Sequence, residues 1–424
     1  MNIAVIGSGI SGLAAAWLLS SQQRVTLFEA DNRLGGHTNT VDVTLGNVTH
    51  PVDTGFLVFN DRTYPNLIQL FELLGVRTVA SDMSFSFRME NNGLEWAGTN
   101  LASVFAQKRN LMRPSFLRMV KDIVRFNRET MQLMKFEAAI SGTLQEYLDR
   151  HQYSDAFRNW YLLPMAAAIW SSPMQQIMAF PLKTFLRFCI NHGLLQLNDR
   201  PQWHTVIGGG REYVRRMAQT ISDIRLDTPV KKIRRHTNYI ELYTKKNGVE
   251  KFDHVILANH SDQALALLAD ADADEIKLLG AIKYQPNRAI LHTDESFLPR
   301  RKIVHAAWNF HAGYGEDNQR PIAVTYLINK LQPLPFTQPV MVTLNPHREP
   351  RVDKIIQRLE YSHPLFDEAT ISAQKKIESI QGRRNTWYCG AWTRYGFHED
   401  GLMSGLRVAS FFGAVSKWRT EMKY

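Results

Sequence analysis

Cysteine is the rarest residue type in this chain of 424 residues, with only Cys189 and Cys389 present. The two stand two hundred positions apart and form no CxxC pair, which argues against a disulfide framework and a zinc site. We therefore expect no metal. The motifs G-x-S-x-G and H-E-x-x-H are also absent, so a serine hydrolase or a zinc protease is not expected. Scarce cysteine fits a reducing compartment, and we expect a cytoplasmic location.

One uncharged stretch, residues 160–182, is long enough to span a bilayer. It contains Pro164, Pro173 and Pro181 together with polar side chains, so we predict a buried wall inside the protein instead. At the start of the chain no basic region precedes the apolar run at Ile3. That run predicts a strand and not a signal peptide.

Charge is unevenly distributed along the chain. The net charge is +10, and between residues 105 and 135 eight basic residues face two acidic ones, a local excess of six. Net charge alone is weak support for nucleic-acid binding, and we expect none. The length predicts two or more domains, and the 44% hydrophobic fraction is that of a globular protein.

The basic segment predicts an amphipathic helix over residues 112–134. At about 100° per residue, apolar side chains share one face and cations share the opposite one. The apolar face holds Met112, Phe116, Val120, Ile123, Met131 and Met134, and the basic face holds Arg118, Lys121, Arg125 and Arg128. Such a helix either packs its apolar face on the domain or lies on an anionic membrane.

The first residues have the pattern strand, glycine turn, helix, strand, acid. An apolar strand over 2–6 runs into G-x-G-x-x-G at Gly7, Gly9 and Gly12, and a second strand ends at Glu29. The glycines permit a tight turn, close approach to a pyrophosphate and close helix packing. The helix amino terminus favours phosphate, and the acid suits ribose hydroxyls, which argues against NADP. NAD and FAD remain.

Residues 29–36, Glu-Ala-Asp-Asn-Arg-Leu-Gly-Gly, favour FAD. They resemble the E-A-x-x-R-x-G-G motif of the flavin-containing amine oxidoreductase superfamily, which includes monoamine and polyamine oxidases and phytoene desaturases. The family usually has Arg after the glycine pair, where this chain has His37. A D-x-G follows at Asp53 and Gly55, where family members pass the flavin ring edge.

The carboxy-terminal part resembles the motif that closes the flavin site in this family. Residues 386–390 predict a strand ending in glycine, and residues 400–405 predict the start of a helix running to about residue 418. The residue that matches the family's aromatic cage is Phe397, with Trp392 and Tyr395 nearby. Cys389 lies on the strand, so we expect a non-covalent flavin.

The resemblance implies FAD contacts from several distant segments. The expected residues are Gly7, Gly9, Ser11, Gly12, Glu29, Arg33, Gly35, Gly36, His37, Asp53, Gly55, Val230, Gly390, Gly401 and Leu402. The implied fold class is α/β, a Rossmann-like FAD-binding domain with a discontinuous substrate domain that contains an antiparallel sheet and a helical insert. Residues 303–310, 322–328 and 340–345 are predicted strands of that sheet.

The predicted segments alternate between the two domains. Residues 1–84, 205–265 and 381–424 are assigned to FAD binding, residues 85–204 to the mainly helical substrate part, and residues 266–380 to the substrate sheet.

Three residues are candidates for catalysis. Alignment with the family places His398 and Glu399 beside the flavin ring, as an acid–base pair or as residues that only cap the last helix. The same alignment puts Arg288 where amine oxidases carry a lysine. The missing lysine and the partial cage make amine oxidation less favoured.

A bacterial subgroup is closer still, through residues 396–402, 258–263 and 291–294. It resembles flavoproteins encoded beside cyclopropane fatty-acyl synthases, which implies a fatty-acyl or other apolar lipid substrate and a partner of that kind. Three functions follow: hydride transfer between a lipid C–H bond and flavin N5, as an oxidoreductase, desaturase or isomerase; amine oxidation; or a non-catalytic, flavin-bearing partner role.

Overall fold

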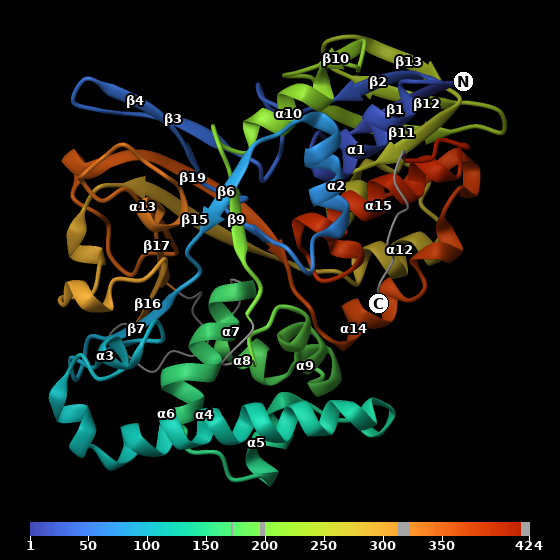
Figure 1. The fold of residues 1–424 in the computed structure, drawn as a ribbon. Coiled ribbons are helices and arrows are strands. Elements are labelled where there is room, and N and C mark those ends of the chain that lie inside the picture. The colour runs from blue at the N-terminus through green and yellow to red at the C-terminus, as the bar shows by residue number, and fades with distance from the viewer. Residues whose placement is uncertain (171–172, 196–199, 313–322, 417–424) are drawn as a thin grey trace.

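The chain folds around two sheets, one parallel and one mixed, with a layer of helices below them (Figure 1). The computed structural model describes residues 1–170, 173–195, 200–312 and 323–416, without the side chains of 137–139. The parallel sheet lies at the upper right of Figure 1, near the labelled amino terminus, and the mixed sheet lies at the left.

The parallel sheet gathers five short strands from distant parts of the sequence. Its order is β10 (Asp223–Arg225), β2 (Arg24–Phe28), β1 (Asn2–Ile6), β14 (His254–Leu257) and β20 (Thr386–Tyr388). Successive residues of β1 alternate between two cores, because strand side chains alternate faces. Ile3 and Val5 pack with helix α1 (Ile10–Leu19), and Ala4 and Ile6 pack toward a small antiparallel sheet.

Helices and that small sheet cover the two faces of the parallel sheet. The first face holds α1, α10 (Arg211–Ala218) and α15 (His398–Ser410). The second holds β11 (Val230–Arg235), β12 (Ile240–Thr244) and β13 (Gly248–Phe252), with α11 (Ser261–Leu267), α12 (Ala273–Gly280) and α14 (Glu368–Gln374) beside them. Both cores consist mainly of buried aliphatic side chains, which is expected for a parallel sheet that is covered on both sides.

The mixed sheet has seven strands in the order β19, β15, β18, β17, β16, β7, β8. All neighbours are antiparallel except β7 and β16. The strands are β7 (Phe85–Met89), β8 (Glu95–Ala97), β15 (Tyr284–His292), β16 (Trp308–Ala312), β17 (Ala323–Leu327), β18 (Met341–Leu344) and β19 (Ile355–Pro364). The predicted strand over 303–310 begins later, because Lys302–Val304 form a 3-10 turn.

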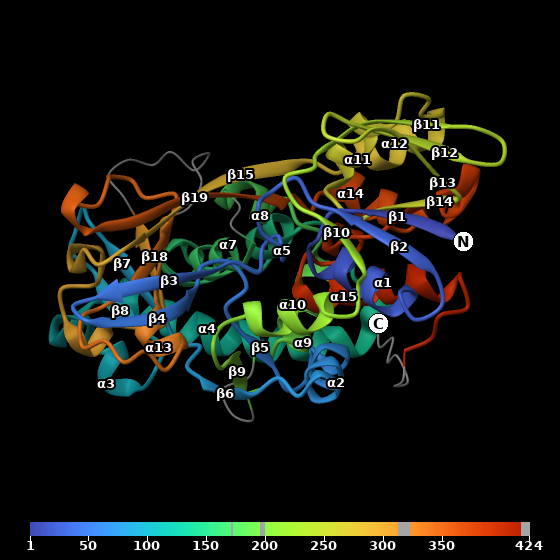
Figure 2. The ribbon, with the colours of Figure 1, turned by 90° about the horizontal axis from the view of Figure 1, so that it is seen from above.

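Helices from residues 101–191 cover one face of the mixed sheet (Figures 1 and 2). They are α3 (Leu101–Val104), η1 (Lys108–Met112), α4 (Pro114–Leu133), η2 (Met134–Ala139), α5 (Leu144–Arg150), α6 (Asp155–Phe157), η3 (Arg158–Leu162), α7 (Leu163–Trp170), α8 (Met174–Met178) and α9 (Leu182–Asn191). The predicted uncharged wall falls on η3, α7 and α8, apart from residues 171–172, which lie outside the described residues. Its side chains belong mostly to the largest apolar core. Among the described residues no helix is long and apolar enough to cross a membrane.

Small elements join the two sheets. They are the hairpin of β3 (Thr40–Leu45) and β4 (Val48–Asp53), the sheet of β5 (Phe59–Asn60), β9 (Trp203–Val206) and β6 (Thr78–Ser81), helix α2 (Pro65–Leu74), helix α13 (Ile328–Leu331) and several short 3-10 turns. The predicted α/β fold with an antiparallel substrate sheet and a helical insert is confirmed. The boundaries of the five predicted segments stay predictions.

Candidate functional site

The first glycine turn joins β1 to α1. Gly7 has a φ of +100°, a value that favours glycine, and a Cβ on Gly12 would lie 1.9 Å from the carbonyl oxygen of Gly7. A Cβ on Gly9 would meet nothing within 4 Å. The turn is therefore closed on its inner side and open in front of the amino terminus of α1, which is the side a pyrophosphate would approach.

Glu29 lies at the end of β2, next to this turn. Its carboxylate accepts hydrogen bonds from the backbone N–H and the hydroxyl of Ser8, at 2.8 and 2.5 Å, and from the N–H of Asp31 at 3.0 Å. The N–H of Thr228 donates to the Glu29 carbonyl at 2.9 Å, which brings the start of β11 and the buried Val230 to the same edge. The structure thus brings together the predicted ribose acid and Val230, another residue expected to contact FAD.

A second glycine pair closes over the first turn. The N–H of Gly35 donates to the carbonyl of Ser8 at 3.0 Å, and a Cβ on Gly36 would lie 3.2 Å from the Cα of Gly9. Arg33 folds back and donates to the carbonyl of Thr38 at 3.3 Å. The two glycine loops that the sequence placed 26 positions apart, counted from Gly9 to Gly35, therefore touch each other.

His37 is the centre of a group of buried and half-buried rings that the sequence did not bring together. Its ring centroid lies 5.1 Å from that of Tyr361, 5.4 Å from His363 and 6.2 Å from His260. Burial, followed by the neighbouring histidines, holds the pKa of His37 well below its usual value. Its Nε2 is buried and has no hydrogen-bond partner among the described residues, so it can serve a bound group.

Asp53 supports the site and does not face an open space. Its carboxylate accepts hydrogen bonds from the N–H of Gly210 at 3.0 and 3.1 Å, from Thr40 at 2.5 Å and from Gln332 at 2.7 Å. Burial raises its pKa to about 6. We conclude that Asp53 fixes the turn before α10. Gly55 makes the close backbone approach, since its Cβ would lie 2.0 Å from the carbonyl oxygen of His37.

The two ends of the chain meet through α1 and α15. A Cβ on Gly405 would lie 2.2 Å from the carbonyl oxygen of Ser11, and one on Gly401 would lie 2.7 Å from Ile10. Leu402 is fully buried against this contact. The N–H of Gly390, just after β20, donates to Ser404 at 2.9 Å. The closing strand and helix therefore stand beside the first glycine turn, as the family resemblance implied.

Both residues of the predicted acid–base pair, His398 and Glu399, contact other side chains or backbone groups of the protein. The ring of His398 stacks on Phe56 with centroids 3.8 Å apart, and its Nε2 lies 2.7 Å from the hydroxyl of Tyr213. Burial lowers the pKa of His398 to about 3. Glu399 points away from this group, and its two oxygens accept three hydrogen bonds from Asn66 and Leu67 at the start of α2. Burial raises its pKa to about 7.

Arg288 does not face the site. It is exposed on β15 and forms an ion pair with Glu349. The neighbouring Asn287 is buried instead, and its side chain lies 3.1 Å from Nδ1 of His363. Side chains alternate faces along a strand, so Arg288 lies on the face of β15 that is turned away from the histidine group. The alignment therefore misplaced Arg288, and Asn287 is the polar side chain that this strand presents to the histidine group.

The sheet face that carries Asn287 becomes apolar farther along. Ala289 and Leu291 lie on the same face and belong to the largest apolar core, together with α7 and α9. Phe397, just before α15, packs on Phe188 of α9 with ring centroids 5.1 Å apart. The histidine group is thus continuous with an apolar region of the largest core, which includes Phe188 and Phe397.

The other predicted cage residues separate. Tyr395 also faces Phe188, at a centroid distance of 6.2 Å. Trp392 points the other way and donates to the carbonyl of Asn259 at 3.1 Å. Phe397 and Tyr395 therefore line the apolar region, and Trp392 belongs to the core beside the parallel sheet.

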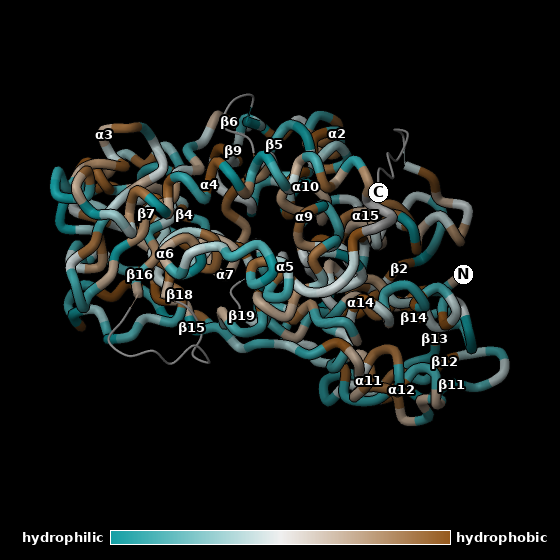
Figure 3. Tube along the Cα trace, turned by 90° about the horizontal axis from the view of Figure 1, so that it is seen from below, coloured by the Kyte–Doolittle hydropathy of each residue, from teal (hydrophilic) through white to brown (hydrophobic). Residues whose placement is uncertain are grey.

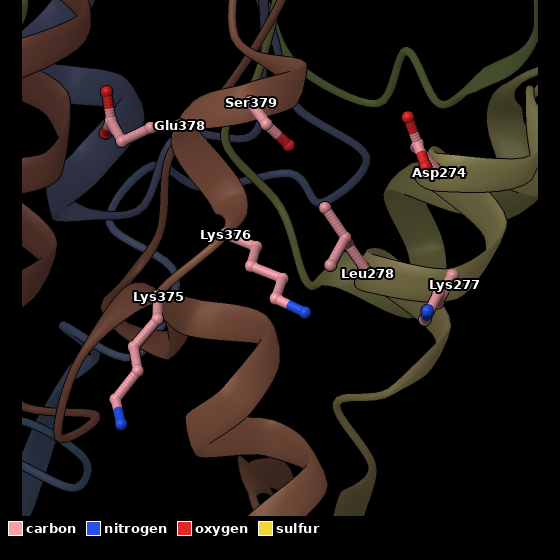
Figure 4. A pocket seen from close by; sticks show the side chains of 7 residues that line it. All are labelled: Asp274, Lys277, Leu278, Lys375, Lys376, Glu378 and Ser379. Carbon is pink, nitrogen blue, oxygen red and sulfur yellow. The ribbon is translucent and has the colours of Figure 1, made fainter.

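A surface hollow of about 450 Å³ lies apart from these residues, between α12 and α14 (Figure 4). Its lining consists of Asp274, Lys277, Leu278, Lys375, Lys376, Glu378 and Ser379. None of the predicted site residues lines it. In the part of the chain that the structure describes, no three histidine, cysteine or acidic residues are grouped to hold a metal ion.

Known proteins resemble this chain in sequence and in fold. Residues 10–342 match the protein family described as flavin containing amine oxidoreductase. The probable polyamine oxidase 4 of Arabidopsis thaliana is 29% identical over 252 residues, which are 56% of this chain and 46% of that protein. The chain thus aligns with about half the length of this curated relative.

Two solved structures share the fold over nearly the whole chain. The CLA-producing fatty acid isomerase from P. acnes has a TM-score of 0.67 at 16% identity, covering 97% of this chain and 98% of that chain. Cyclohexylamine oxidase from Brevibacterium oxydans IH-35A has a TM-score of 0.65 at 16% identity, covering 97% and 99%. At these identities the likeness establishes the fold, and it leaves the substrate open.

Proposed function

The chain belongs to the flavin-containing amine oxidoreductase family and is a flavin-dependent oxidoreductase, and from this premise we propose that its flavin is non-covalent FAD and its substrate an apolar lipid. One observation carries the FAD proposal: the two glycine loops touch while Gly9 faces open space at the amino terminus of α1. Bare backbone N–H groups beside a helix amino terminus suit a pyrophosphate. The carboxylate of Glu29, at the end of the next strand, suits an adenosine ribose.

The burial of the two cysteines supports non-covalent binding of the flavin. Both cysteines are buried and free. Burial raises the pKa of Cys389 to about 12, so its thiol stays protonated and a poor nucleophile. Buried, reduced thiols also agree with the cytoplasmic location that we propose.

The residues of this chain would position the cofactor and keep the reaction dry. When bound, FAD supplies the hydride acceptor at N5. His37 Nε2 is a buried polar atom without a hydrogen-bond partner among the described residues, and a group bound at the flavin site can form that hydrogen bond. Asp53 and Gly55 fix the backbone beside it. The apolar face beyond Asn287 excludes water, which suits a C–H bond that must lie close to the acceptor.

The lipid substrate is supported by the chemistry of that face. Beyond Asn287 the wall consists of aliphatic and aromatic side chains from β15, α7 and α9, with Phe397 at its edge. Burial of each methylene of an acyl chain against such a surface contributes about 0.8 kcal/mol of favourable free energy. The fatty acid isomerase is the structural relative that agrees with this proposal. Whether the net reaction is oxidation, desaturation or isomerisation is left to experiment.

Amine oxidation is the second candidate, because a polyamine oxidase and a cyclohexylamine oxidase are among the relatives. A third candidate is a flavin-bearing subunit that acts with a cyclopropane-synthase-like enzyme. The three differ in what reduces the flavin, so one spectrum can separate them.

The test is a visible spectrum of the purified protein under anaerobic conditions, before and after adding vesicles of bacterial phospholipid. A colourless protein that takes up no FAD would overturn the cofactor proposal. Bleaching by lipid supports the acyl substrate, whereas bleaching by amines, with release of hydrogen peroxide in air, would establish amine oxidation. A flavin that only dithionite bleaches would favour isomerisation if the recovered lipid has moved double bonds, and the partner role if the lipid is unchanged.

A further inference from the structure

Large apolar side chains are exposed together along α3, η1, α4 and the start of η2. Of the 18 large apolar side chains that are exposed in the described part of the chain, seven lie between residues 101 and 136. They are Leu101, Leu111, Met112, Leu117, Val124, Met131 and Phe136. Met112 and Phe136, at either end of α4, are 88% and 72% exposed. Scattered exposed apolar residues are ordinary, but a group of them marks an interaction surface.

On α4 these residues form one stripe with cations. Leu117, Lys121, Val124, Arg128 and Met131 are all exposed and follow each other at spacings of four and three. Residues at these spacings lie on the same side of a helix. The predicted helix from Met112 to Met134 placed the apolar residues on one face and the cations on the other. That separation was wrong for Met131 and for Met112, which precedes α4 in η1.

The opposite side of α4 holds the helix in place. Phe116, Met119 and Phe126 are buried in the largest apolar core. The two acidic residues of the helix are also turned toward the protein, where Asp122 accepts from Ser154 and Glu129 accepts from the hydroxyl of Tyr153. The outward side of α4 therefore keeps the cations and apolar groups, while the acids are engaged with the domain.

A basic hollow lies beside the start of this segment. It has a volume of about 720 Å³ and is lined by Lys108, Arg109, Arg300 and Arg301, with Asn92 and Gln107. Ile303, just after the arginine pair, is 54% exposed. Arginine and lysine donors around a hollow of this size suit a phosphate group, and the exposed apolar side chains beside it suit the acyl chains that a phospholipid carries.

From the stripe and the hollow together, we propose that residues 101–136 and 300–303 form a docking surface for an anionic phospholipid bilayer. We call this surface the α4 face. It lies on the side of the molecule seen in Figure 3. A bilayer interface takes up apolar side chains between the headgroups and attracts cations to its surface. A nucleic acid would use the cations only, and the exposed Val124, Met131 and Phe136 favour the bilayer.

The α4 face is long enough for this role. The 20 residues of α4 extend over about 30 Å, and α3, η1 and the basic hollow extend the surface beyond the start of the helix. The proposal concerns where the protein sits, so it goes beyond the flavin chemistry and does not depend on the substrate.

The test is co-sedimentation of the full chain with vesicles of phosphatidylcholine, with and without phosphatidylglycerol. The wild-type chain should bind only the anionic vesicles, and added salt should weaken binding. The triple variant Lys121→Gln, Arg128→Gln, Lys135→Gln should lower the affinity on the order of a hundredfold, because each cation contributes roughly fivefold. A second variant, Met112→Ser, Val124→Ser, Phe136→Ser, keeps the charge and should also weaken binding.

A matched control removes the same charge elsewhere. The variant Lys277→Gln, Lys375→Gln, Lys376→Gln neutralises the lysines of the hollow between α12 and α14 (Figure 4), and it should retain most of the binding. If the two charge-neutralising triple variants lose the same vesicle affinity, binding depends on net charge alone and the proposal is overturned. The proposal would also be overturned if the chain bound no anionic vesicles at all. The same holds if it bound single-stranded DNA more tightly than vesicles and the serine variant left that DNA binding unchanged. Flavin absorbance and the thermal midpoint of each variant show that it is folded, so a failure here leaves the proposed flavin function standing.

Discussion

Glu399 should act as a cap for α2 and not as an acid or base. The side chain is 6% exposed. One oxygen accepts from the backbone N–H and the amide of Asn66, at 2.9 and 2.7 Å, and the other accepts from the N–H of Leu67 at 2.9 Å. In Glu399→Gln the new amide group would face the Leu67 N–H, so this buried donor would lose its acceptor and the amide itself would be a second donor without one.

The cost can be worked out from these contacts. An unsatisfied buried donor costs about 1 to 3 kcal/mol and a lost cap about 1 kcal/mol, so we expect about 3 kcal/mol. At roughly 2 cal/mol/K of unfolding entropy per residue, the 424 residues convert this cost into a fall of about 3 °C in the thermal midpoint. The measurement is thermal unfolding at pH 8, where the carboxylate of wild-type Glu399, with a pKa of about 7, is ionised.

The same cap makes a prediction about pH. Because the pKa of Glu399 is raised in the fold, the folded wild type takes up a proton as the pH falls through about 7, while the unfolded chain does not. The stability of wild type relative to Glu399→Gln should therefore grow as the pH falls toward 5. The control is Glu378→Gln, because Glu378 is exposed in its ion pair with Arg407 and should contribute little. An unchanged midpoint combined with slower reduction of the flavin by substrate would refute the cap and assign acid–base chemistry to Glu399.

Three further predictions concern the site and its surroundings. Gly9→Leu fills the open space before α1, so the protein should lose flavin absorbance while the apoprotein melts as wild-type apoprotein does; full flavin occupancy would contradict the pyrophosphate site. Arg288→Ala should leave the rate of flavin reduction unchanged, because the side chain is exposed; a large loss in stopped-flow experiments would restore the catalytic prediction. The free energy of unfolding of the apoprotein should fall as the pH drops from about 6.5 toward 4. Burial lowers the pKa of His363 to about 4 and of His398 to about 3, so the unfolded chain binds more protons in this window. Asp53, Glu399 and Asp400 act in the opposite direction, since their pKa values are raised, but more histidines have a lowered pKa than carboxyls have a raised one. Urea titrations that show greater stability at pH 5 than at pH 7 would contradict this balance.

Local patterns in the sequence were enough to predict the glycine turns. Gly7 is required by its own φ of +100° and Gly12 by its approach to the carbonyl oxygen of Gly7, and both conditions lie within one strand–turn–helix unit, so their spacing implies the geometry. The start of α15 needed one more local contact. The sequence placed it at Asp400, but the carboxylate of Asp400 accepts from the N–H of Phe397, and this cap accompanies the start of the helix at His398.

Contacts between distant strands could not be predicted in the same way. Arg288 and Asn287 differ only in which face of β15 they occupy, and the pairing of β15 with β19 and β18 sets that face. The group of His37, His260 and His363 combines three loops or strands that only the assembled fold brings together. Its one sequence signal was the alternation of Tyr361 and His363 along a strand.

The meeting of α1 and α15 also has a consequence for biosynthesis. α1 is made first, yet its buried surface is completed by Gly401 and Gly405, nearly four hundred residues later, and β14 likewise waits for β20. At ribosomal rates of roughly 5 to 20 residues per second, that interval is about 20 to 80 s. During this time the apolar face of α1 and the edge of β14 must be protected from other chains. A nascent chain stalled before residue 386 should therefore depend on chaperones far more than the finished protein does.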